Sequence, residues 1–112
     1  MNECIFCKIV QGEIPSKRLF ESADFIAVND VSPVAPTHVL LISKLHVANI
    51  LEAAGLQRRL PFLETVYSVA KQLSLEKRGF RLVVNTGEQG GQTVNHFHAH
   101  IIAGRQMAWP PG

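Results

Sequence analysis

The stretch Val94-Asn95-His96-Phe97-His98-Ala99-His100-Ile101-Ile102 contains three of the five histidines of the chain, one at every second position. Side chains of a β-strand alternate between its two faces, so an extended backbone places the three imidazoles on one face. The apolar residues between them then point to the other face, toward a core. The stretch therefore predicts a strand over 94–102 that carries a row of histidines.

The composition indicates one folded domain over residues 1–112. Of the 112 residues, 46% are hydrophobic and 18% are charged, which is enough apolar material for one core. Eleven Lys and Arg stand against nine Asp and Glu, and because the basic residues are scattered we expect no nucleic-acid partner. No signal peptide is recognisable, and no apolar run approaches the roughly 18 residues of a membrane span. We therefore expect a cytoplasmic protein that does not enter a membrane.

The pattern of apolar residues divides the chain into short elements. It predicts a helical turn over 4–10, and strands over 17–21, 25–29, 38–42 and 81–85. Apolar residues at three- and four-residue steps predict an amphipathic helix over 53–75. Pro61 interrupts this helix, which is either kinked there or begins its regular part near Leu60. Strands joined by short turns, with one long helix, indicate an antiparallel α+β fold.

The residues before the histidine row favour phosphate chemistry. Histidine can act as a nucleophile, an acid or base, or a metal ligand, so the strand alone leaves a zinc site and a phosphate site open. Gly90 and Gly91 allow backbone N–H groups to approach an anion, and the Thr93 hydroxyl adds a donor. Asn85 faces the same pocket if the strands over 81–85 and 94–102 pair.

Two residues upstream have two interpretations each. The carboxylate of Asp30 can accept hydrogen bonds from both hydroxyls of a ribose, although aspartate in such a proline-rich loop more often forms a turn. His38, taken alone, indicates a partner in an interior hydrogen-bond network rather than a catalyst.

Cys4 and Cys7 are the only cysteines and have the spacing C-x-x-C. In a reduced compartment this spacing favours a pair of metal ligands or a redox motif over a stabilising disulfide.

The motif Asn85-x-Gly-x-x-Gly-Gly-Gln-Thr-Val-x-His-x-His-x-His, with the ending Gly104-Arg105-Gln106-Met107-x-Trp109-Pro110-Pro111-Gly112, resembles the histidine-triad (HIT) superfamily. The closest similarity is to the Hint branch, the histidine-triad nucleotide-binding proteins. It extends over Gly12-Glu13-Ile14-Pro15 and the stretch 30–38, and so runs almost end to end. The resemblance implies an antiparallel sheet of about five strands with one long helix and a short N-terminal helix.

The resemblance also implies an activity. Hint proteins bind purine nucleoside monophosphates (AMP and GMP) and hydrolyse adenosine 5′-phosphoramidates to AMP and an amine, with no cofactor required for catalysis. The implied nucleophile is His98, which forms a nucleotidyl-histidine intermediate, and the other implied catalytic residues are His100, His96, His38 and Thr93. The implied nucleotide-binding residues are Phe6, Ile9, Val28, Asn29, Asp30, Val31, Asn85, Gly91, Gln92, Thr93, His98 and His100.

Three further expectations come from the same resemblance. Relatives with the C-x-x-C pair hold a structural zinc, which here implies the ligands Cys4, Cys7, His46 and His96 and removes His96 from the phosphate site. The alternative is two unligated thiols on a short turn. A homodimer through the long helix and the adjoining strands is implied. The alternative functions are dinucleoside polyphosphate hydrolysis or nucleotidyl transfer, as in other HIT proteins, and a nucleotide-responsive interaction protein.

Overall fold

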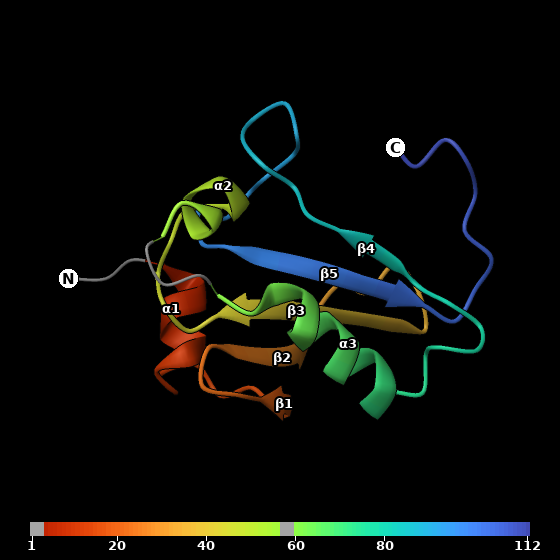
Figure 1. Ribbon diagram of the computed structural model, residues 1–112, viewed down its shortest axis with the longest axis horizontal. Helices are drawn as coiled ribbons and strands as arrows, with labels where there is room; N and C mark the ends of the chain where they lie inside the picture. The colour runs from red at the N-terminus through yellow and green to blue at the C-terminus, as the bar shows by residue number, and fades with distance from the viewer. Residues whose placement is uncertain (1–3, 57–59) are drawn as a thin grey trace.

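The computed structural model describes residues 4–56 and 60–112, and within them the chain forms one five-stranded antiparallel sheet with three helices (Figure 1). The strands are β1 (Arg18–Glu21), β2 (Phe25–Asn29), β3 (Thr37–Ser43), β4 (Arg81–Val83) and β5 (His98–Ala103), in the spatial order β1-β2-β3-β5-β4. The helices are α1 (Ile5–Val10), α2 (Ile50–Ala54) and α3 (Phe62–Gln72). This confirms the predicted α+β fold. None of these helices is long and apolar enough to cross a membrane.

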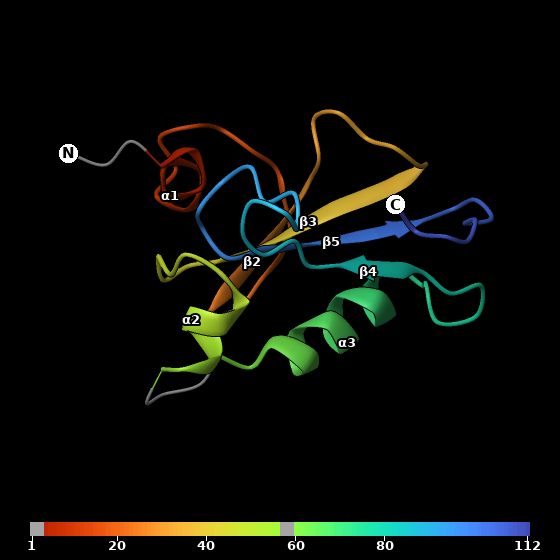
Figure 2. The same cartoon turned by 90° about the horizontal axis from the view of Figure 1, so that it is seen from above.

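Apolar clusters cover both faces of the sheet, and a further one at α2 consists of Phe25, Val47, Ala53 and Phe97. Figure 2 shows α2 and α3 on one side of the sheet and α1 on the other. The core on the α3 side consists of Ala27, Val39, Leu41, Val66, Val69, Ala70, Leu75, Ala99, Ile101 and Ala103. The core on the α1 side consists of Phe6, Ile26, Val28, Leu40 and Ile42. In β2, β3 and β5 the residues with odd numbers thus face α3 and those with even numbers face α1, which places His98 and His100 on the α1 side.

The strand predicted over 94–102 is shorter than expected, and this prediction was wrong for its first four residues. β5 begins at His98, because its partner β3 runs only to Ser43 and the ladder between them starts with the pair Ile42 and His98. The chain before it bends, and the N–H of Phe97 donates instead to the carbonyl of Val47. His96 therefore lies outside β5, although its ring, like that of His98, meets Phe6 of α1. β4 likewise ends at Val83 rather than at residue 85.

The amphipathic helix predicted over 53–75 is two helices. α2 ends at Ala54, and α3 begins at Phe62, directly after Pro61. Proline is tolerated at a helix start because the first N–H groups of a helix have no partner within it. The regular helix therefore begins near Leu60, as one of the two alternatives had it. Residues 57–59 of the predicted helix lie outside the described residues.

Candidate active site

His98 is the buried histidine of β5, packed under α1. Its ring meets the ring of Phe6 edge to face, with 4.8 Å between the centroids. Its Nδ1 atom lies 2.7 Å from the main-chain oxygen of His96. A carbonyl oxygen only accepts hydrogen bonds, so Nδ1 carries the hydrogen and Nε2 of the neutral ring keeps a lone pair. His98 can therefore act as a nucleophile through Nε2.

His100, two residues along the same strand face, is joined to His38 of β3. The N–H of Val34 donates to Nδ1 of His38 (3.1 Å), which leaves the hydrogen of the neutral His38 ring on Nε2. This Nε2 lies 2.9 Å from Nδ1 of His100 and 3.3 Å from a carboxylate oxygen of Asp30. His38 therefore donates toward both, and because Nδ1 of His100 accepts, the hydrogen of a neutral His100 is on Nε2.

The surroundings of His100 favour its neutral form. Burial lowers the pKa of His100, and the neighbouring rings of His98 and His38 lower it further, while the Asp30 carboxylate opposes them. The ring centroids of His98 and His100 are 5.3 Å apart. The face of β5 therefore presents a lone pair on one imidazole beside an N–H donor on the next, which suits attack on a phosphorus atom whose oxygens need hydrogen bonds.

The glycine-rich loop before β5 is held by side chains within it. A Cβ atom on Gly90 would lie 2.3 Å from the main-chain oxygen of Thr86, so no larger residue fits without moving the backbone. The Asn85 side chain donates to the Gly90 carbonyl (2.7 Å), and the Gln92 side chain donates to the carbonyl of Ala48 (2.6 Å). These bonds set the loop shape, and Gly91 and Thr93 lie exposed within it.

The apolar residues expected around a purine base fall into two groups. Phe6, Ile9 and Val28 belong to the core on the α1 side, next to His98. Val31 lies outside this group, because its side chain is 97% exposed in the loop after β2. Asn29 is also exposed, at the end of β2. The structure thus brings three of the four apolar residues together.

Cys4, Cys7, His46 and His96 form a second cluster beside the first, and their ligand atoms all lie within 4.8 Å of one another. Nδ1 of His96 lies 3.3 Å from Sγ of Cys4, 3.4 Å from Sγ of Cys7 and 3.0 Å from Nδ1 of His46. The cysteines are not joined in a disulfide. The cluster ties α1 to the segments that follow β3 and precede β5.

The donor set of this cluster fits a zinc ion. Nε2 of His96 lies 2.7 Å from the carbonyl oxygen of Ser43, so Nε2 carries the hydrogen and Nδ1 points its lone pair at the cysteines. Burial lowers the pKa of His96, which favours the neutral, ligating form. Tetrahedral zinc with two sulfur and two nitrogen ligands separates its ligand atoms by about 3.3–3.8 Å. The observed sulfur-to-nitrogen and nitrogen-to-nitrogen distances lie within a few tenths of an ångström of this range.

Two groups that shape the site have no local signature in the sequence. The N–H of Val34 and the carbonyl of Ser43 decide the tautomers of His38 and His96. Both are main-chain groups, and any residue type supplies them. The buried Ser43 is a partial exception, because a polar residue at the end of an apolar strand indicates a hydrogen-bonding role.

Comparisons with known proteins agree with this fold. Residues 11–107 match the HIT domain family. The chain is 44% identical over 112 residues to an adenylylsulfatase HINT1 of Arabidopsis thaliana, covering 96% of this chain and 76% of that protein. It is 42% identical over 116 residues to a 14 kDa zinc-binding protein of Brassica juncea, covering 98% of this chain and all of that protein. A solved histidine triad protein from Clostridium difficile superposes with a TM-score of 0.86 at 36% identity, covering 96% of each chain.

Proposed function

We propose, from the premise that this chain belongs to the HIT domain family, that it hydrolyses purine nucleoside 5′-phosphoramidates to a nucleoside monophosphate and an amine. The observation that carries the proposal is the complementary pair of tautomers on β5, a lone pair on Nε2 of His98 beside an N–H on Nε2 of His100. The Arabidopsis relative, an adenylylsulfatase by name, supports chemistry at an adenylyl phosphorus.

In the first step, Nε2 of His98 attacks the α-phosphorus and the P–N bond of the substrate breaks. The electron pair of that bond leaves with the amine, which takes up a proton, and the Thr93 hydroxyl stands in the exposed loop where it can supply one. The imidazole becomes positively charged as it bonds to phosphorus. The hydrogen bond from Nδ1–H of His98 to the carbonyl of His96 strengthens as this charge forms.

In the second step, water attacks the phosphorus and the bond to His98 breaks, which releases the monophosphate and restores the imidazole. Splitting one displacement into two is the general gain of covalent catalysis. Nε2–H of His100, together with the backbone N–H of Thr93, stabilises the charge on the non-bridging oxygens. The N–H groups of Gly91 and Gln92 donate within the turn, to the carbonyls of Glu88 and Gly87. Asn85 and Gln92 contribute by holding the loop that carries these groups.

The nucleoside lies over the sheet end beside α1. Phe6, Ile9 and Val28 supply the apolar wall for the base. Asp30, whose carboxylate is partly exposed beside His38, accepts hydrogen bonds from the ribose hydroxyls. The exposed residues Asn29 and Val31 lie next to it in the chain and complete the ribose side of the site.

The cluster of Cys4, Cys7, His46 and His96 binds a structural zinc ion in this proposal. The support is the tetrahedral fit of its four donors and the similarity to a zinc-binding protein. Bound there, zinc would cross-link three segments of the chain and leave catalysis to the other residues. His96 then takes part in the reaction only through its main-chain carbonyl.

The protein acts as a cytoplasmic homodimer in this proposal. β4 is an edge strand of the sheet, and the exposed face of α3 carries Leu63 and Tyr67, one helical turn apart and 73% and 66% exposed. Large apolar side chains aligned on one helix beside an unpaired strand edge are typical of a subunit interface.

A second candidate reaction is hydrolysis of adenylyl sulfate, in which sulfate leaves instead of an amine. The 44% identity to the adenylylsulfatase favours it. Both reactions use the same attack by His98 and the same intermediate. A comparison of kcat/KM for adenosine 5′-phosphoramidate, adenylyl sulfate and diadenosine polyphosphates therefore separates the leaving-group preferences.

The experiment that tests the mechanism is mass spectrometry of protein quenched during turnover of an adenosine 5′-phosphoramidate. Wild-type protein is expected to carry one AMP adduct on the peptide containing His98, and His98→Ala protein none. Turnover that survives in the His98→Ala variant would contradict the mechanism. Absence of turnover of every nucleotide tested in wild-type protein would favour a nucleotide-binding interaction protein.

A further inference from the structure

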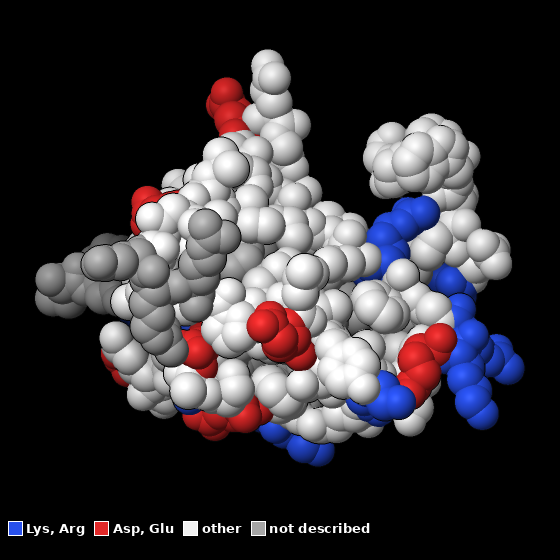
Figure 3. Space-filling model, in the orientation of Figure 1, with Lys and Arg blue, Asp and Glu red and all other residues white. Residues whose placement is uncertain are grey.

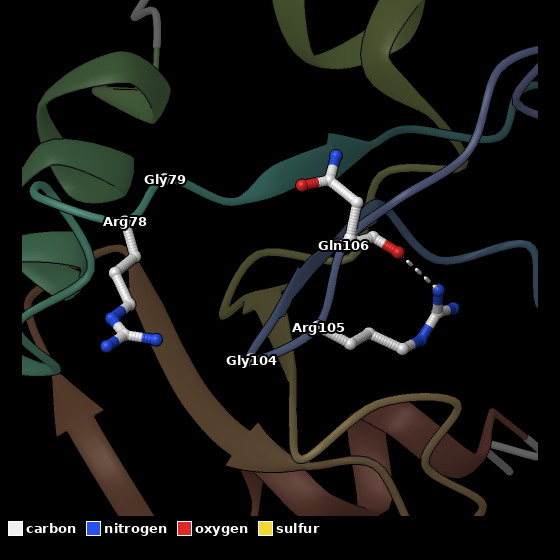
Figure 4. A pocket seen from close by; sticks show the side chains of 5 residues that line it. All are labelled: Arg78, Gly79, Gly104, Arg105 and Gln106. Atoms are coloured by element: carbon white, nitrogen blue, oxygen red, sulfur yellow. Dashed lines mark hydrogen bonds between the residues drawn. The ribbon is translucent and has the colours of Figure 1, made fainter.

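Lys and Arg side chains gather at the end of the molecule where the C-terminal tail lies (Figure 3). Arg78, Gly79, Gly104, Arg105 and Gln106 line a polar cavity of about 350 Å³ there. Two arginines on one cavity suggest an anion site, but in Figure 4 the Arg105 side chain runs away from Arg78. Its Nη1 donates weakly to the carbonyl of Gln106 (3.5 Å), and its Nε donates to the carbonyl of Val34 (3.0 Å).

Val34 connects Arg105 to the histidines of the site. It lies in the loop between β2 and β3 with its side chain exposed, and both of its hydrogen bonds to these residues are made by its main chain. Its carbonyl accepts from Arg105, and its N–H donates to Nδ1 of His38. One residue thus receives the arginine on one side and orients a site histidine on the other.

The turn that carries Arg105 is fitted against the same loop. Gly104 has φ +98°, and a Cβ atom there would lie 2.9 Å from Cβ of Pro36. The pairing of Thr37 with Ala103 brings the end of the loop and the start of the turn side by side. Arg105 therefore donates to Val34 from a turn that packs closely against the same loop.

The hydrogen bond from Val34 and the Asp30 carboxylate, 3.3 Å from Nε2, together place the hydrogen of His38 on Nε2. With Nδ1 of His38 accepting, Nε2–H points to Nδ1 of His100 and to Asp30, and His100 keeps its hydrogen on Nε2. If Val34 withdraws, only Asp30 still favours this tautomer, and a fraction of His38 takes the opposite one, with a lone pair on Nε2. His100 must then donate from Nδ1, and its Nε2 loses the hydrogen that the proposed reaction needs.

We infer that Arg105 is a positioning residue of the active site: by holding Val34 it keeps His38, and through it His100, in the tautomer that directs an N–H at the substrate phosphate. The inference rests on the proposed function for its catalytic consequence, whereas the effect of Arg105 on the tautomers is independent of any substrate.

The test compares Arg105→Ala with Arg78→Ala, which removes an arginine from the same cavity without touching Val34. Long-range proton–nitrogen correlation spectra of ¹⁵N-histidine protein report the tautomers directly. Wild-type and Arg78→Ala protein are expected to show His38 and His100 with the hydrogen on Nε2, and Arg105→Ala protein a mixture of tautomers. The kcat for the phosphoramidate is expected to fall about tenfold in Arg105→Ala, the loss of roughly one hydrogen bond, with KM unchanged.

Arg105→Lys provides the conservative variant, because its ammonium group can still donate to the Val34 carbonyl, and it is expected to recover part of both signals. Unchanged tautomers in folded Arg105→Ala and Arg105→Lys protein would overturn the inference, whatever the activity. Tautomers that shift as expected in a protein that hydrolyses no nucleotide would support the role of Arg105 in positioning and overturn the proposed function alone.

Discussion

Nδ1 of His98 lies 2.7 Å from the main-chain oxygen of His96, and this contact joins the two clusters of the protein. The side chain of His96 faces Cys4 and Cys7, while its carbonyl orients the ring of His98. A segment anchored by the cysteine cluster therefore sets the direction of the proposed nucleophile. The chemistry and the stability of this site are coupled through one residue.

The first prediction concerns the atom of attack. Because Nδ1–H of His98 is used by the carbonyl of His96, AMP is expected to bond to Nε2. Phosphorus–nitrogen coupling in ¹⁵N-histidine protein trapped during turnover distinguishes the two ring nitrogens. His100→Gln protein, in which the nucleophile is intact, is expected to give the same adduct more slowly. Attachment of AMP at Nδ1 would show that the His98 ring rotates by half a turn before it reacts.

The second prediction concerns the metal. Purified wild-type protein is expected to contain about one zinc per chain by elemental mass spectrometry, and Cys7→Ser protein far less. Loss of a structural zinc removes several kcal/mol of folding free energy, so the melting temperature of Cys7→Ser protein is expected to fall. A chelator should lower the melting temperature of wild-type protein and leave that of the variant unchanged. Metal-free wild-type protein of full stability would refute the zinc site.

The third prediction concerns pH. The pKa of His100 in the folded protein is lowered, mainly by burial, below the value of 6.5 expected when it is unfolded. The unfolded chain therefore binds more protons, and the free energy of unfolding decreases as the pH falls through about 6.5, by at most about 1.4 kcal/mol per pH unit for this group. Urea titrations at several pH values are expected to show a shallower decrease for His100→Gln than for wild-type protein. Equal changes of unfolding free energy with pH in the two proteins would contradict a lowered pKa of His100 in the folded protein.

The fourth prediction concerns the ribose. If the Asp30 carboxylate accepts from the ribose hydroxyls, wild-type protein should prefer an adenosine phosphoramidate over its 2′-deoxy analogue. Hydrogen bonds to charged groups contribute roughly 1.5–3 kcal/mol, so a preference of about 10–100-fold in kcat/KM is expected. Asp30→Asn should reduce this ratio. Asp30 also contacts His38, and the ratio separates ribose recognition from a general loss of activity. An unchanged ratio in Asp30→Asn protein would show that Asp30 contacts His38 but does not recognise the ribose.

The fifth prediction concerns the glycine loop. Gly90→Ala is expected to lower both the melting temperature and kcat, because the added Cβ would lie 2.3 Å from the Thr86 oxygen and the loop must shift. Gly55→Ala is the matched control, since its Cβ meets ordinary contacts of 3.4 Å or more and its φ of −81° suits alanine. Equal effects of the two substitutions would show that the shape of the loop around Gly90 does not matter.

Several elements were predictable from local patterns. The strand over 25–29 matches β2, and the apolar run over 38–42 lies within β3, in the middle of the sheet, because β-branched and large apolar residues that are covered on both faces leave a continuous signal. The helical turn over 4–10 contains α1. In these elements the buried residues are neighbours in the chain, so their apolar pattern is visible in the sequence.

The elements whose bounds were predicted wrongly depend on pairing partners far along the chain. His96 looks like a strand residue, yet β5 can start only where β3 offers a ladder partner, and β3 ends at Ser43. The alternation of the three histidines is real in the sequence, but the backbone bends before it reaches the second of them. A hydrogen-bond ladder needs two strands, and periodicity describes only one.

By itself, the sequence determined the α+β class, the shared strand face of His98 and His100, and the pairing of Cys4 with Cys7 as candidate ligands, because alternation and spacing are properties of the covalent chain. His46 and His96 were expected to join the cysteines only from the family resemblance. Only the tertiary structure decided which nitrogen of each histidine carries its hydrogen. That choice depends on the N–H of Val34 and on the carbonyls of Ser43 and His96. Main-chain groups are the same in every residue, so folding alone distinguishes the ones that orient this site.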